Sequence, residues 1–69
     1  MEDKELIEKL KKEKSDLLNK INKLHSLIID KKFSDLSSEY QFMTKMQYNI
    51  MVDYYQLVAR RIELLEKGE

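Results

Sequence analysis

Apolar residues recur with a heptad period through the first part of the chain. Two heptad positions carry them: Ile7, Lys14, Ile21 and Ile28 at one, and Leu10, Leu17 and Leu24 at the other. Side chains three and four residues apart share one face of a helix, so the pattern predicts an amphipathic helix over about residues 3–29. Lys14 is the polar exception, and its long stem can lie along apolar surface with the ammonium group in water. Selection of the helix register is the alternative role for such a residue.

The second half of the chain predicts a helix over about residues 38–67 that is apolar on two adjacent faces. One face, here called the Tyr48 stripe, consists of Tyr48, Met51, Tyr55, Val58, Ile62 and Leu65. The other, the Ile50 stripe, consists of Met43, Gln47, Ile50, Tyr54, Leu57, Arg61 and Leu64. One partner helix covers one such stripe, so two stripes require two partners.

The helical pattern stops in residues 30–37, which connect the two predicted helices. Serines and aspartates are frequent there, and these residues hydrogen-bond their own backbone and favour helix caps. We expect Ser37, or Ser38 in a capping box with Gln41, to cap the second helix. Phe33 and Leu36 are expected to close the end of the hairpin, with room for a short helical turn.

These elements predict an all-α fold, a two-helix antiparallel hairpin in one domain over residues 1–69. A chain of 69 residues has room for only one other long helix, so the second partner is expected to be another copy or another protein. We therefore predict a homo-oligomeric helical bundle, a dimer or higher, with no monomer at micromolar concentration. The Tyr48 stripe is assigned to the oligomer interface: Tyr48, Met51, Tyr55, Val58, Ile62 and Leu65. The pattern leaves open which stripe packs within the chain.

Composition narrows the function classes. Thirteen basic residues balance thirteen acidic ones, which argues against nucleic-acid binding driven by phosphate neutralisation. The chain has no cysteine and one histidine, so we predict no metal site, no cofactor and no catalytic residue. No apolar run is long enough for a membrane span and no leader is evident, so a soluble cytoplasmic protein is expected.

Gln47, Tyr54 and Arg61 are spaced by seven and form a polar line in the Ile50 stripe. A buried arginine needs partners for its donors, and one interpretation is a structural network in which Arg61 pairs with Asp16 or Asp53. The other is a ligand pocket. In that pocket Arg61 and Arg60 bind phosphate, Tyr54 or Tyr48 stacks on a base, and Gln47 adds a polar contact.

The second helix reads Gln47-x-x-Ile50-Met51-x-x-Tyr54-x-x-Leu57-Val58-x-x-Arg61-Ile62 and follows a Phe33-x-x-Leu36-Ser37 joint. This order resembles a family of short, uncharacterised tailed-phage helical proteins named after a member from a crAss-like phage. The resemblance covers about residues 10–65. Met43-Thr44 departs from it, because the family pattern has two leucines there.

The resemblance implies a phage-encoded helical hairpin without known enzymatic activity, acting in the cytoplasm of an infected bacterium. Its size and architecture favour an antagonist of host defence that sequesters a small anionic signal, such as a cyclic nucleotide, between subunits. The alternative is a protein–protein inhibitor or adaptor, like an anti-CRISPR, that docks a host defence protein on its surplus apolar face. A structural role in the virion is a third possibility.

Overall fold

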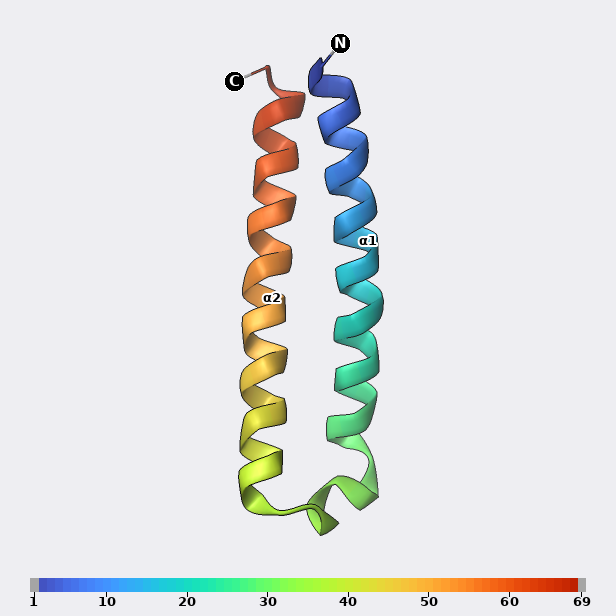
Figure 1. The fold of residues 1–69 in the computed structure, drawn as a ribbon, viewed down its shortest axis with the longest axis vertical. Helices are drawn as coiled ribbons and strands as arrows, with labels where there is room; N and C mark the ends of the chain where they lie inside the picture. Colours follow the sequence, from blue (N-terminus) through green and yellow to red (C-terminus); the bar gives the residue numbers. More distant parts are fainter. Residues whose placement is uncertain (1, 69) are drawn as a thin grey trace.

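The computed structural model describes residues 2–68 as an antiparallel pair of long helices (Figure 1). Helix α1 spans Glu2–Ile29, the short 3₁₀ helix η1 spans Lys31–Asp35, and helix α2 spans Ser38–Glu66. The molecule measures 51 × 15 × 13 Å, so it is a long and thin hairpin. The start of α1 and the end of α2 lie together at the end opposite η1 (Figure 1). The all-α prediction and the packing of the two helices against each other are confirmed.

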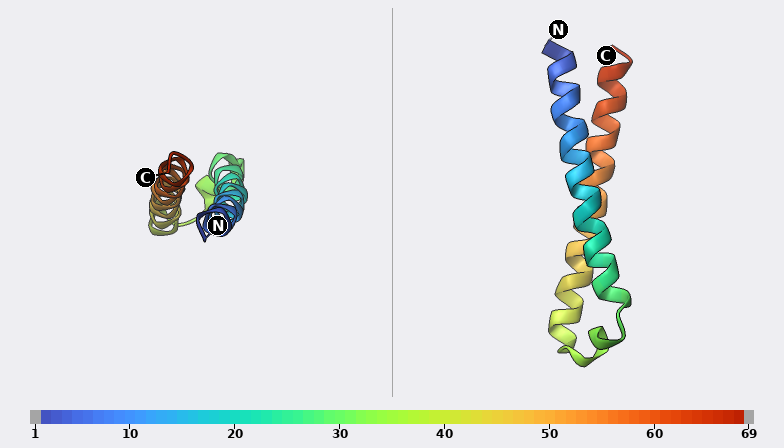
Figure 2. Two further views of the ribbon diagram at one scale, coloured as in Figure 1. Left: turned by 90° about the horizontal axis from the view of Figure 1, so that it is seen from above. Right: turned by 90° about the vertical axis from the view of Figure 1, so that its right-hand side faces the viewer.

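The Tyr48 stripe packs against α1 of the same chain. Val58 is 0% exposed and forms the core with Ile62, Leu10 and Leu17. Three further members of the stripe pack around this core, namely Met51, Tyr55 and Leu65. Ile7 from α1 packs against the same core. The two helices are inclined to each other and cross near the middle of the hairpin (Figure 2), as expected when side-chain ridges of one helix enter the grooves of the other.

The residues that were predicted to form the oligomer interface therefore lie within the chain instead. Tyr48, Met51, Tyr55, Val58, Ile62 and Leu65 are all buried or half-buried against α1. The physical reason is the composition of the two stripes. The Tyr48 stripe has no strongly polar member, whereas burying the Ile50 stripe would desolvate Gln47 and Arg61.

The connection is ordered by local hydrogen bonds. The Asp30 carboxylate accepts from the backbone N–H of Lys32 at 2.8 Å, which caps η1. The Phe33 ring is buried at the hairpin end, as predicted, while Leu36 stays partly exposed. The Nζ of Lys45 lies 6.0 Å from the centre of the Phe33 ring. This places α2 and η1 in contact around one aromatic side chain.

Ser37, rather than Ser38, caps α2. Its hydroxyl accepts from the backbone N–H of Tyr40 at 3.1 Å, which satisfies one of the donors left free in the first turn. The Gln41 side chain donates backward to the carbonyl oxygens of Leu36 at 2.8 Å and Ser34 at 3.3 Å, so it ties the connection to α2 instead of completing a capping box with Ser38.

The C-terminal end of α2 is set by Gly68, whose φ of 77° lies in the left-handed region that glycine adopts without strain. Its N–H donates to the Leu65 carbonyl at 3.0 Å.

Candidate functional site

The Ile50 stripe forms the exposed side of α2, turned away from the core. Met43, Ile50 and Leu57 are 62%, 61% and 64% exposed, which is unusual for large apolar side chains that follow one another at heptad spacing. Gln47 and Arg61 are also exposed. The hairpin therefore presents a continuous face that is apolar along its centre and polar at intervals.

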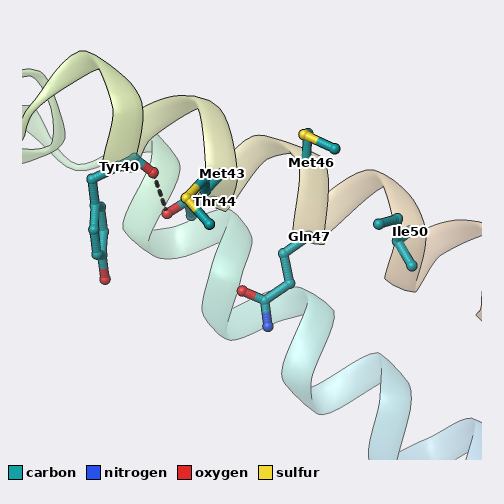
Figure 3. Close-up of a pocket in the computed structure, with 6 residues that line it drawn as sticks. All are labelled: Tyr40, Met43, Thr44, Met46, Gln47 and Ile50. Atoms are coloured by element: carbon teal, nitrogen blue, oxygen red, sulfur yellow. Dashed lines mark hydrogen bonds between the residues drawn. The ribbon is translucent and has the colours of Figure 1, made fainter.

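A groove of about 480 Å³ runs along the first half of this face. It is lined by six residues of α2: Tyr40, Met43, Thr44, Met46, Gln47 and Ile50 (Figure 3). Tyr40 and Gln47 extend from the same side of the helix (Figure 3), so an aromatic ring and an amide point into one space. The lining is mainly apolar, with few polar groups, as is common for sites that hold small organic ligands.

Of the groove residues, only Gln47 belongs to the predicted site. Thr44 is the groove residue that stands out in the sequence, because it is a polar residue among apolar ones. A threonine in such a place needs a hydrogen-bond partner for its hydroxyl. Thr44 is buried and donates to the Tyr40 carbonyl at 2.9 Å, one turn back along α2. The hydroxyl is thereby satisfied within α2, and Thr44 lines the groove together with Tyr40.

Tyr54 lies at the edge between α2 and α1, where its hydroxyl donates a hydrogen bond to the Glu13 carboxylate. This bond and the negative charge of Glu13 raise the pKa of Tyr54 above its ordinary value of 10.0, and the positive charge of Arg61 opposes the shift. Tyr54 is therefore held by α1 at its hydroxyl, while the residue as a whole remains 44% exposed.

The two neighbouring arginines differ in their surroundings. Arg60 donates to the Glu63 carboxylate at 3.0 Å, an exposed pair one turn apart on α2. Arg61 makes no ion pair within 4.0 Å in the described part of the chain, and neither Asp16 nor Asp53, its predicted partners, contacts it. An exposed guanidinium with its fork of donors unoccupied is suited to bind a phosphate or carboxylate from another molecule.

The five residues of the predicted ligand site do not converge within one chain. Gln47 and Arg61 are fourteen residues apart on one helix, which corresponds to about 21 Å at 1.5 Å per residue. Tyr48 lies on the intrachain side, where its ring is 6.1 Å from that of His25. Tyr54 stands between Gln47 and Arg61 on the exposed face. A single copy therefore offers an apolar groove beside Tyr40 and, further along α2, an arginine that has no ion pair among residues 2–68.

Neither helix in residues 2–68 has an apolar stretch long enough to cross a bilayer. Over the same residues, no three His, Asp or Glu side chains gather in a way that could hold a metal ion.

The comparison with family models places the hairpin in a known group. The model of a family described as Sequestin matches residues 4–64, which include both helices and the connection. This chain belongs to the Sequestin family. The family name denotes sequestration, which is consistent with a binding protein. No curated protein and no solved structure matches the chain. A relationship at the level of a small family is thus shown, and phage origin stays a prediction.

Proposed function

We propose that this Sequestin protein is a non-catalytic binding protein that sequesters a small anionic signal molecule between subunits. The proposed ligand is a cyclic nucleotide or a related compound of similar size. The observation that carries the proposal is Arg61, an exposed arginine without a carboxylate partner among residues 2–68, on the same face as an apolar groove. An arginine binds phosphate through two parallel hydrogen bonds, and an aromatic ring stacks on a base.

The proposed roles follow from the exposed chemistry. Arg61 binds the phosphate, and Tyr54 and Tyr40 offer ring faces to a base. Gln47 in the groove has both a donor and an acceptor, so it can recognise the edge of a base. Arg60 is already paired with Glu63 and adds positive charge beside Arg61. Tyr48 packs within the hairpin and is assigned no ligand contact.

A phage origin, which the resemblance of the sequence implies, would give this binding activity a biological role. A protein that binds a host alarm nucleotide without degrading it would antagonise host defence in the cytoplasm of an infected bacterium by lowering the free concentration of the signal. The family name Sequestin supports a sequestering role. Catalysis is not part of the proposal.

Isothermal titration calorimetry with a panel of cyclic di- and trinucleotides and cyclic ADP-ribose isomers tests this function. One compound of the panel should bind at micromolar affinity or tighter. Arg61→Ala should weaken its binding at least about tenfold, because a hydrogen-bonded charge contact contributes roughly 1.5–3 kcal/mol. Lys23→Ala, which removes one positive charge from the outer face of α1, is the matched control and should leave the affinity unchanged. Absence of heat for every compound would refute the proposal.

A second candidate function is favoured by the apolar exposure of the Ile50 stripe. In this alternative the stripe docks on a host defence protein, as an amphipathic helix fills a groove. Ile50→Asp should then abolish inhibition of that protein, while Arg61→Ala should remain fully active. The reverse pattern, loss with Arg61→Ala alone, would contradict this alternative.

A further inference from the structure

The exposed face of α2 has a two-fold pattern centred on Ile50. Met43 and Leu57 lie seven residues before and after Ile50, and Glu39 and Arg61 lie eleven residues before and after it. Seven or eleven residues bring the helix back to within about 20° of the same direction, so all five positions share one face. All five are exposed. The face is thus apolar at its centre, acidic at one end and basic at the other.

The positions closer to the centre flank this line. At about 100° per residue, Gln47 and Tyr54 lie roughly 60° and 40° from Ile50 on the side towards α1, and Met46 and Asp53 lie roughly 40° and 60° from it on the other side. The two-fold pattern is therefore carried by the central line of Met43, Ile50 and Leu57 and by the charges at its two ends.

We propose that a second copy of this chain docks on this face, with the two α2 helices antiparallel and Ile50 opposite Ile50. In an isologous two-fold contact, each residue before the centre faces the residue equally far after the centre in the other copy. Glu39 then pairs with Arg61 of the second copy, and Met43 with Leu57 of the second copy. A parallel pair would instead set Arg61 against Arg61 and Glu39 against Glu39, which places like charges together.

The direction of this face fits a second helix beside α1. The residues that α2 buries against α1, such as Val58 and Ile62, point about a quarter-turn away from the Ile50 direction when each residue is counted as 100°. A helix of the second copy can therefore pack on α2 without displacing α1, as neighbours do in a four-helix bundle.

This pairing completes the site of the proposed function, and that consequence rests on the proposed function. Arg61 of one copy lies about 20 Å from the groove of its own chain. Antiparallel pairing brings this arginine level with Glu39 of the second copy, which is next to Tyr40 in the groove of the second copy. An anion held there replaces Glu39 as the partner of the arginine. Each dimer then has two equal sites, and each site takes its groove from one copy and its arginine from the other.

Cysteine cross-linking tests the pairing without any ligand. The natural chain has no cysteine, so Met43→Cys and Leu57→Cys each introduce a single thiol at an exposed position. After mild oxidation of an equimolar mixture, mass spectrometry should find the mixed disulfide as the main covalent dimer, because facing positions of packed helices come within disulfide range. Ile29→Cys, an exposed position on α1, mixed with Leu57→Cys gives the background. Disulfides between identical variants, or a mixed disulfide no more abundant than that background, would overturn the proposal.

Charge exchange gives a second, independent test. Glu39→Arg or Arg61→Glu alone should weaken dimerisation about tenfold, since each change sets like charges together at both ends of the contact. The double variant should restore the wild-type dissociation constant, and a double variant weaker than either single one would contradict the pairing. If the cross-links form while the calorimetric panel gives no heat, the pairing holds and the proposed function fails. If a nucleotide binds while the cross-links are absent, the proposed function holds and the pairing fails.

Discussion

Val58 is the side chain on which the stability of the hairpin depends most clearly. It is fully buried at the centre of the contact between α1 and α2, among Leu10, Leu17 and Ile62. Val58→Ala removes two carbon atoms, and each buried carbon contributes roughly 0.8 kcal/mol before the added cost of the cavity. We therefore expect a loss of about 2 kcal/mol in the free energy of unfolding.

A loss of this size is large for so small a protein. A domain of this length rarely has more than about 3–5 kcal/mol of stability from its core alone. The midpoint of thermal unfolding should fall by about 10 °C, because 1 kcal/mol corresponds to roughly 4–8 °C in domains of 60–100 residues. Urea and thermal unfolding followed by circular dichroism at 222 nm measure both quantities.

The control is Ile29→Ala, at an exposed position on α1. This change removes three carbon atoms, one more than Val58→Ala, from a side chain that is 66% exposed. It should change the free energy of unfolding by less than about 0.5 kcal/mol. Equal effects of the two variants would refute the assignment of the Tyr48 stripe to the intrachain core.

Two further predictions concern local contacts. The Tyr54 phenol should titrate at a lower pKa in Glu13→Gln and at a higher pKa in Arg61→Ala. Ultraviolet absorbance measures this titration, and a Tyr54→Phe variant identifies which part of the signal belongs to Tyr54. Because its folded-state pKa lies above 10.0, the stabilisation from this hydrogen bond should be complete below pH 10 and be lost as the pH rises through the folded-state value; an unchanged pKa in Glu13→Gln would disprove the contact. Ser37→Ala should reduce the free energy of unfolding by about 1 kcal/mol and Ser38→Ala by clearly less, as urea unfolding can measure, and the opposite order would identify Ser38 as the cap.

The helices could be predicted from the sequence because their signals are local. Heptad spacing, the run of capping residues before Ser38 and the single glycine near the end act within a few residues of each other. Lys14 also follows this logic, since it is half-buried with its Nζ 5.6 Å from the centre of the Tyr55 ring. The exact cap was harder to predict, because Ser37 and Ser38 have the same chemistry and the backbone angles choose between them.

The sequence contains a difference between the two stripes in their polar residues. Both stripes carry large apolar residues at heptad spacing, so apolar content alone does not separate them. Gln47 and Arg61 do separate them, since burial without partners is costly for both side chains. The cost of burying these two side chains therefore favours the Tyr48 stripe in the core and the Ile50 stripe on the surface, as the structure has them.

The candidate site was only partly predictable. Gln47, Tyr54 and Arg61 share the exposed face, as their spacing indicated, but the partner of Tyr54 is Glu13, 41 residues away in the chain. Such a contact depends on the rotation and crossing of two helices, which no local pattern fixes.

Sedimentation velocity at micromolar concentration tests the central claim, a hairpin whose exposed Ile50 stripe is covered by a second copy. The wild-type chain should sediment as a dimer or larger species, and Ile50→Glu should sediment as a monomer that keeps its helical circular dichroism. This contrast is expected because a charge at the two-fold centre faces the same charge of the second copy, whereas the core between α1 and α2 does not include Ile50. A folded wild-type monomer at micromolar concentration would contradict it.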